Sequence, residues 1–226
     1  MIFFVTTNHI LGRRIGITIM KTEKNLKTFI YDSILEGIFS GEYKPNQILN
    51  EKELVEKYGC SKSPVRDALI ALCNEGILRN IPRYGYEVVR LTKETVEQVL
   101  EYRLILESGY LRLSYNKITP SQIEELKKID ILCNEPEKDM FAHWDSNQNF
   151  HLQLISLSGS AYAFQELKRS MGLLKRAYAQ FYWDKWDKLL IPSDMKCHKE
   201  ILHALEKKDI EQAIVYLATD LQDFGM

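Results

Sequence analysis

The chain has 226 residues, of which 45% are hydrophobic, and this length and composition suffice for two domains with separate cores. Its 30 basic and 31 acidic side chains give a formal net charge of −1, so any affinity for nucleic acid must come from a local cluster of charge. The four cysteines are scattered without a CxxC pair, which argues against a zinc finger and against a disulfide framework. We therefore expect a cytoplasmic globular protein with free thiols.

The first 20 residues differ in character from the rest of the chain. A short apolar run is followed by Arg13 and Arg14, so the segment is too short for a membrane span and lacks the order of a secretion signal. We expect residues 1–20 to be a doubtful N-terminal arm, either a start-site artefact or a loose extension, and we expect no membrane segment. The residues after Met20 predict a helix with one apolar face, formed by Leu26, Phe29, Ile30, Ile34 and Ile38.

Two short helices joined by a tight turn are predicted next. Asn50 is a suitable N-cap for the first helix, and Gly59 can adopt the left-handed conformation that ends it. The second helix is predicted to begin at Ser63-Pro64, so the two helices must cross steeply. Apolar residues with helical spacing predict its buried stripe, at Val65, Ala68, Leu69 and Leu72. The polar residues left at its exposed N-terminal end are Lys62, Ser63 and Arg66.

A small β-hairpin is predicted after these helices. Residues 78–81 and 86–90 are β-prone, and the turn Pro82-Arg83-Tyr84-Gly85 joins them. Two crossed helices followed by a hairpin are typical of a winged helix-turn-helix, which we place at residues 21–91.

These residues resemble the DNA-binding domain of the GntR family of transcription regulators. The resemblance rests on the runs Leu49-Asn50-Glu51-Lys52-Glu53-Leu54, Gly59-Cys60-Ser61-Lys62-Ser63-Pro64-Val65-Arg66, Asn74-Glu75-Gly76 and Arg83-Tyr84-Gly85. It implies contacts to phosphates and base edges from Lys52, Ser61, Lys62, Ser63 and Arg66, and an approach of the wing to the minor groove through Arg83 and Gly85. Lysine replaces the family's usual arginine at positions 52 and 62, which disfavours bidentate reading of guanine there. Each lysine alone also fits an ordinary surface charge, but caps, turn, stripe and wing agree on one motif.

From residue 93 onward the sequence has only helical periodicity, and we place a second domain at residues 92–226. Helices are predicted at residues 93–116, 120–133, 140–157, 162–186, 194–205 and 210–224. Pro192 is predicted to break the chain before the fifth of these helices, and Asp209 to cap the last one. Short connections between them predict an antiparallel bundle of six to seven helices. The whole chain is therefore expected to be mainly α, with an N-terminal winged helix-turn-helix and a small β-hairpin wing.

This second half resembles the FCD ligand-binding domain of the FadR-like branch of the same family. The resemblance rests on Asn147-Gln148-Asn149-Phe150-His151 and on His198, Asp209, Ala213 and Asp220. It implies a divalent metal site formed by Asn147, His151, His198 and Asp220, for Zn, Ni, Mn or Fe. Compared with an Asp-His-His-His site, a carboxylate has moved to the last position and one imidazole is lost, which favours oxygen-preferring metals such as Mn. The alternative for His151 is a core histidine bonded to a carbonyl group.

Arg103 and Glu107 look like the family's Arg-x-x-x-Glu on the first bundle helix. One interpretation is an ordinary i, i+4 ion pair, and the other is that Arg103 faces the cavity and binds a carboxylate of the effector. Both stay open at this point. His143 is predicted to lie near the pocket, and His203 on the surface.

Together these predictions describe a transcription regulator, expected to be a repressor, that binds a double-stranded DNA operator as a homodimer. A small-molecule effector, expected to be a carboxylate, would change its DNA affinity. We expect no enzymatic activity. Two alternatives remain: a metal-sensing regulator whose effector is the ion itself, and a metal-dependent hydrolase with Glu107 or Glu200 as general base, although nothing distinctive surrounds either residue in the sequence.

Overall fold

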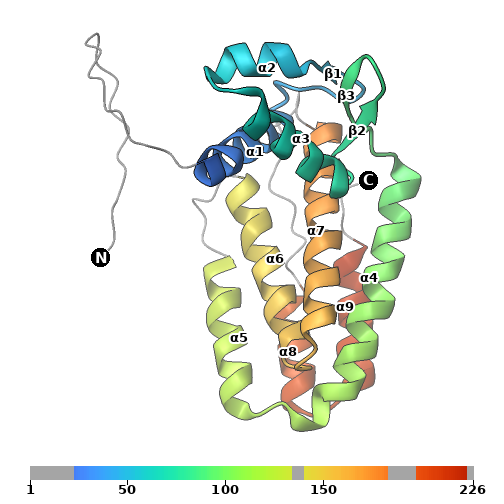
Figure 1. Cartoon of the computed structure of the whole chain (residues 1–226). Helices are drawn as coiled ribbons and strands as arrows, with labels where there is room; N and C mark the ends of the chain where they lie inside the picture. The colour runs from blue at the N-terminus through green and yellow to red at the C-terminus, as the bar shows by residue number, and fades with distance from the viewer. Residues whose placement is uncertain (1–22, 134–139, 183–196, 223–226) are drawn as a thin grey trace, which may run out of the picture.

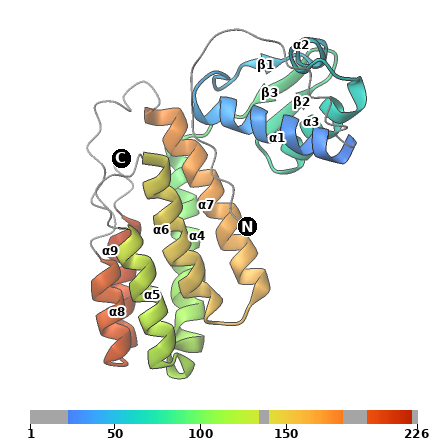
Figure 2. The ribbon, with the colours of Figure 1, turned by 90° about the vertical axis from the view of Figure 1, so that its left-hand side faces the viewer.

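The computed structural model describes residues 23–133, 140–182 and 197–222, and all structural statements below refer to these residues. They form an N-terminal unit of three helices and a small sheet, followed by a bundle of long helices (Figure 1). The N-terminal unit lies at one end of the bundle, next to the C-terminal end of helix α7 (Ala161–Tyr182), as Figure 2 shows from the side. The predicted N-terminal arm, residues 1–20, lies outside the described residues.

The predicted helix-turn-helix is confirmed in α2 (Glu51–Tyr58) and α3 (Lys62–Asn74). Asn50 Oδ1 accepts a hydrogen bond from the Lys52 amide at 2.8 Å, and Gly59 ends α2 in the left-handed conformation with φ 60°. The stripe predicted for α3 is fully buried, at Val65, Ala68, Leu69 and Leu72. The second helix begins one residue earlier than predicted, so Lys62 belongs to its first turn.

Helix α1 (Glu23–Phe39) packs its apolar face against α3. Ile30, Ile34 and Ile38 are buried in the core of the N-terminal unit, as predicted. The prediction was wrong for Phe29, which is 45% exposed and forms an edge-to-face pair with the Tyr58 ring, with centroids 6.2 Å apart. Phe29 lies beside the stripe and not in it, because a step of three residues from Leu26 falls short of a full helical turn, whereas the steps of four to Ile30, Ile34 and Ile38 pass it.

The sheet has three antiparallel strands in the order β1-β3-β2, where the sequence predicted a two-stranded hairpin. The strands are β1 (Ile48–Leu49), β2 (Leu78–Ile81) and β3 (Gly85–Val88). The added strand β1 pairs Leu49 with Tyr86 of β3. It also explains Gly85, whose φ is 138° and where a Cβ would lie 2.5 Å from the Leu49 carbonyl oxygen. The glycine therefore lets β1 approach the hairpin.

Six α-helices of the bundle lie within the described residues, in agreement with the sequence. They are α4 (Lys93–Ser114), α5 (Pro120–Cys133), α6 (Met140–Ser156), α7, α8 (His198–Glu206) and α9 (Ile210–Leu221), with a short 3-10 turn at Tyr115–Lys117. Asp209 caps α9 by accepting from the Gln212 amide at 3.1 Å, as predicted. The predicted extension of α7 to Trp186 and the break at Pro192 fall outside the described residues.

The bundle has a continuous apolar core that surrounds a polar centre. Side chains of α4, α5, α6, α8 and α9 form this core, with Phe150 and Leu217 fully buried, while α7 packs on α6 through Leu167 and Met171. None of the described helices combines the length and the apolar character that a membrane crossing requires.

Candidate metal centre and nucleic-acid interface

The N-terminal end of α3 is exposed and polar, as the sequence predicted. Ser61 is the N-cap, with extended backbone, and its hydroxyl makes no capping hydrogen bond. The side chains of Lys62 and Arg66 are 71% and 56% exposed, and Ser63 is also exposed. Open backbone amides and cations at a helix start suit phosphate and base contacts.

Glu51, to which the sequence interpretation gave no role, holds both cations of this end. Its carboxylate accepts from Arg66 Nε at 3.1 Å and Arg66 Nη2 at 3.2 Å, and it lies 3.6 Å from Lys62 Nζ. The hydrogen bond and charge of Glu51 raise the pKa of Arg66 further above its ordinary value. One edge of the Arg66 fork is therefore occupied, and Arg66 is held in a defined orientation at the start of α3.

Two further predicted DNA contacts also lie at exposed positions. The Lys52 side chain is 83% exposed, 4.0 Å from Glu56. Arg83 is exposed at the tip of the wing, in the left-handed conformation with φ 73°. Contact of these residues, of Ser61, Lys62, Ser63 and Arg66, and of Gly85 with DNA stays a prediction.

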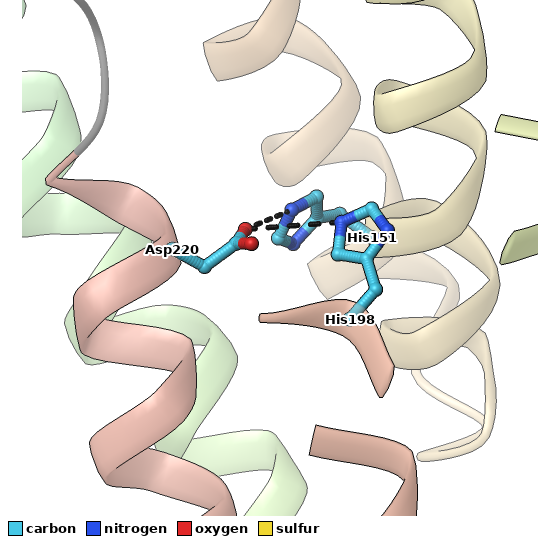
Figure 3. A group of neighbouring side chains, drawn as sticks. All are labelled: His151, His198 and Asp220. Carbon is cyan, nitrogen blue, oxygen red and sulfur yellow. Dashed lines mark hydrogen bonds and ion pairs between the residues drawn. The ribbon is translucent and has the colours of Figure 1, made fainter. Parts of the chain in front are cut away.

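A buried cluster brings together three of the four predicted metal ligands, from three different helices. His151 of α6, His198 of α8 and Asp220 of α9 point toward one another in the centre of the bundle (Figure 3). His151 Nε2 lies 3.0 Å from Asp220 Oδ2, and His198 Nε2 lies 3.8 Å from the same oxygen. None of the three side chains is more than 1% exposed.

A second carboxylate stands behind each imidazole. Glu107 Oε2 of α4 lies 2.7 Å from His151 Nδ1, and Asp130 Oδ1 of α5 lies 3.3 Å from His198 Nδ1, although this second contact lacks hydrogen-bond geometry. A histidine that faces a metal with one nitrogen and a carboxylate with the other is the usual arrangement in metalloproteins. The Phe150 ring stacks on His198 with centroids 3.7 Å apart, which fixes the plane of that imidazole.

The expectation that nothing distinctive surrounds Glu107 was wrong. Burial alone would raise the pKa of Glu107, but the Arg103 guanidinium and His151 outweigh it and hold this pKa below its ordinary value. Burial likewise lowers the pKa of His151, but Glu107 and Asp220 outweigh it and raise this pKa to about 9. Without a metal ion, His151 therefore binds a proton on each nitrogen and is a buried imidazolium between two carboxylates.

The donor set fits a divalent ion. Within the described part of the chain, both nitrogens of His198 and Oδ1 of Asp220 are buried without a hydrogen-bond partner. Buried polar atoms are rarely left unpaired, so such atoms indicate a missing ligand. One ligand atom from each of the three residues lies within 4.8 Å of the others. Ligands about 2.1 Å from a tetrahedral zinc lie about 3.4 Å apart, so small side-chain shifts would complete the site.

The other residues that the sequence suggested for the metal site or its surroundings differ in burial and position. Asn147, the fourth predicted ligand, is buried one turn before His151 on α6, where it stays a predicted ligand. His203 is on the surface, as predicted, with a side chain that is 64% exposed. Glu200, considered as a general base, is exposed and outside the cluster. The side chain of His143 is outside the described residues.

Arg103 is buried and paired with Glu107, so the ion-pair interpretation is confirmed. Arg103 Nε donates to Glu107 Oε1 at 2.9 Å, and the two side chains are 5% and 2% exposed. Arg103 Nη2 has no hydrogen-bond partner among the described residues. The effector-binding role predicted for Arg103 therefore remains compatible with the pair.

Sequence reasoning missed Asp130 and the role of Glu107, although one signal was present. Both are carboxylates on the buried faces of their helices: Asp130 lies between Leu126 and Cys133 on α5, and Glu107 lies between Arg103 and Leu111 on α4. Carboxylates are almost never fully buried unless they are paired. A carboxylate at such a position thus indicates a buried partner.

Comparisons with known proteins agree with this architecture. The family model "Bacterial regulatory proteins, gntR family" matches residues 26–88, and the FCD domain model matches residues 98–222. The transcriptional repressor RspR of Escherichia coli is 26% identical over 201 residues, which cover 87% of this chain and 86% of that protein. The regulator YdhC of Bacillus subtilis is 30% identical over 134 residues, 57% of this chain and 58% of its own.

A solved structure has the same fold. McbR/YncC of E. coli superposes with a TM-score of 0.67 at 22% identity, covering 87% of this chain and 93% of its own. The family is one of transcription regulators and not of enzymes, so the hydrolase alternative is set aside. This chain belongs to the GntR family of DNA-binding transcription regulators, in the FadR-like branch that carries an FCD domain.

Proposed function

We propose that this regulator is a homodimeric repressor whose operator affinity changes when a small carboxylate effector binds in the bundle together with a divalent metal ion. The observation that carries the proposal is the buried group of His151, His198 and Asp220, backed by Glu107 and Asp130. A polar centre in an apolar bundle is unfavourable unless its groups are paired or coordinate a metal. The presence of this polar group in the bundle core therefore supports a ligand-binding role.

His151, His198 and Asp220 would hold the ion, with Asn147 as a fourth ligand. Two imidazoles, one carboxylate and one amide oxygen form a set of intermediate hardness, which suits Mn, Fe, Ni or Zn. When bound, the ion would supply an open position for an effector oxygen. The proton on His151 Nε2 would leave, while Nδ1 would continue to donate to Glu107.

Arg103 is the candidate for binding the effector. Its Nε is fixed by Glu107 at 2.9 Å, and its Nη2 is buried without a protein partner in the described segments. A guanidinium with one edge fixed presents the other in a defined direction, which suits a carboxylate. Glu107 thus connects the proposed effector group to the proposed metal ligand His151.

DNA contacts are proposed for the α2–α3 end and the wing, in two copies per dimer. A single helix-turn-helix reads a short half-site, and dimers gain specificity from two. An exposed apolar stripe on α4 supports dimerisation, with Tyr102 40%, Ile105 66% and Leu113 74% exposed. Repression is proposed because the similar E. coli protein RspR is a repressor.

Metal content and DNA affinity, measured on the same samples, test the proposal. Elemental analysis of purified protein should find a divalent metal, and His151→Ala and His198→Ala should lose it. The matched control is His203→Ala, an exposed histidine on the same helix as His198, which should keep the metal. Absence of metal from wild-type protein after dialysis against each of Mn²⁺, Fe²⁺, Ni²⁺ and Zn²⁺ would contradict the metal site.

Fluorescence anisotropy of a labelled duplex from the region upstream of its own gene then tests the effector. Chelated and metal-loaded protein should be titrated with and without a panel of small organic acids. A change of about 5- to 150-fold in DNA affinity is the usual range for such coupling. A change that requires an organic acid would support the carboxylate effector, whereas a change with metal alone would assign the ion as effector. No change under any condition would overturn the regulatory role of the bundle.

A further inference from the structure

Three hydrogen bonds tie α7 of the bundle to the N-terminal unit. Arg176 Nη1 donates to the Gly76 carbonyl at 3.2 Å, and Gln180 Nε2 donates to the Val89 carbonyl at 2.8 Å. The Leu91 amide donates to Gln180 Oε1 at 2.9 Å. Arg176 and Gln180 are four residues apart, so they lie one turn apart on the same face of α7.

The atoms bound by these two side chains belong to the base of the wing. Gly76 lies just before β2 and Val89 just after β3, and the Val89 amide donates to the Ile77 carbonyl at 3.1 Å. Because the bound groups are backbone atoms, the contacts fix the path of the chain whatever its side chains are. Arg176 and Gln180 therefore hold one structural unit, the two ends of the hairpin.

The same contact fixes the direction of α3. This helix ends at Asn74, two residues before the carbonyl that Arg176 binds, and its other end presents Lys62 and Arg66. A helix of 13 residues is about 20 Å long and rigid, so a small rotation at Gly76 moves the reading end by several ångströms.

The N-terminal unit also meets α7 through α1, where Lys175 Nζ lies 5.6 Å from the centroid of the Phe39 ring. Beside this contact and Arg176, a cleft of about 670 Å³ lies between the two parts, lined on one side by Tyr31, Leu35 and Ile77 and on the other by Lys168, Gly172 and Leu173. Domains without a large apolar interface move relative to each other by default. Apolar packing of Val89 and Leu91 against α7 anchors the linker, but it does not specify an angle as directional hydrogen bonds do.

We propose that Arg176 and Gln180 are positioning residues that set the orientation of the N-terminal unit on the bundle and thereby the half-site spacing that the dimer recognises. The inference rests on the proposed function, since it requires a dimer bound to two half-sites. When both reading ends engage at once, the second contact is intramolecular and adds greatly to the affinity; this gain disappears when the geometry forbids it. A fixed orientation of the N-terminal unit on the bundle thus makes the dimer selective for one half-site spacing.

The test uses the full-length dimer and duplexes that contain two copies of a half-site selected by wild-type protein from a random library. The spacing is varied in single base pairs. Wild type should bind its best spacing on the order of 100-fold more tightly than one shifted by about half a helical turn. In Arg176→Met/Gln180→Ala this ratio should fall below roughly tenfold, while affinity for a single half-site stays unchanged.

A matched double variant in the bundle is the control. Lys127→Met/Gln153→Ala removes one cation and one amide from α5 and α6; within the described part of the chain Lys127 bonds to Glu124 and Glu206 of the bundle, and Gln153 is exposed. It should keep the wild-type spacing ratio. If the first double variant loses helical content, the single variant Gln180→Ala, at a half-buried position, decides.

An unchanged ratio in a folded Arg176 or Gln180 variant would overturn the proposal, and so would a wild type that binds all spacings equally. A wild type that selects no duplex at all would instead overturn the DNA-binding dimer on which the proposal rests. A folded variant with a flattened spacing profile and intact half-site affinity would support it.

Discussion

Replacing Glu107 by glutamine should destabilise the metal-free bundle and weaken metal binding. The Glu107 side chain is 2% exposed and contacts Arg103 Nε at 2.9 Å and His151 Nδ1 at 2.7 Å. The amide keeps the shape but removes the charge, which leaves two buried cations without this counter-charge. Removing one partner of a buried pair costs about 3–5 kcal/mol, and since the amide oxygen still accepts a hydrogen bond we expect about 3 kcal/mol.

Urea unfolding of the chelated protein, followed by far-UV circular dichroism, measures this loss. With a denaturant slope of about 3 kcal/mol/M, the midpoint should fall by about 1 M. Glu124→Gln is the control, because Glu124 is 61% exposed and pairs with Lys127 on the surface. An exposed pair contributes less than about 1 kcal/mol, so the control midpoint should hardly move.

Isothermal titration with Mn²⁺ and Zn²⁺ gives the second readout for Glu107→Gln. Loss of a carboxylate that orients a metal-binding histidine typically weakens metal binding by about 10- to 100-fold. Equal urea midpoints for Glu107→Gln and Glu124→Gln would refute the buried charge pair. Unchanged metal affinity would show that Glu107 does not support His151 as a ligand.

Gly85→Ala should lower the melting temperature more than Gly59→Ala. Both positions have positive φ, which costs an alanine about 1–2 kcal/mol, but only at Gly85 does the new methyl group meet the Leu49 carbonyl oxygen, at 2.5 Å. Equal falls in melting temperature would contradict this clash. The pKa of His151 is raised from 6.5 to about 9, so its proton stabilises the metal-free fold fully below pH 6.5, and this contribution is lost as the pH rises to 9. The melting temperature of chelated wild type should therefore fall more between pH 6.5 and pH 9 than that of His151→Gln. An equal fall in both proteins would contradict a stabilising proton on His151. Glu51→Gln removes a negative charge beside the N-terminal end of α3, so it should tighten non-specific DNA binding and lower the ratio of specific to non-specific affinity. Fluorescence anisotropy at several salt concentrations measures both affinities, and an unchanged ratio would argue against an orienting role for Glu51.

Local signals in the sequence were sufficient for most of the fold. Caps and glycines act within a few residues, so Asn50, Gly59 and Asp209 mark helix ends correctly. Strand β1 could not be predicted in the same way, because two residues have no period and their extended conformation depends on pairing with β3, more than 30 residues later.

The same distinction applies to the candidate site, where the sequence predicts some residues and only the folded structure reveals the others. His151, His198 and Asp220 follow from the resemblance to the FCD family, and the structure brings them together. The contacts of Glu107 to His151 and of Asp130 to His198 could not be assigned, since they depend on which helices become neighbours. Glu51 was missed for the same reason at shorter range: it lies 15 residues from Arg66, and only the turn between α2 and α3 brings them into contact.

DNA binding by the exposed end of α3 is the central claim, and the operator affinity of Lys62→Ala and Arg66→Ala tests it most directly. Both variants should keep the wild-type far-UV circular dichroism spectrum and lose binding to a duplex selected by wild-type protein from fragments around its own locus. Lys127→Ala, which removes a half-buried cation of the bundle, should bind that duplex as wild type does. Unchanged operator affinity in both α3 variants would contradict the account.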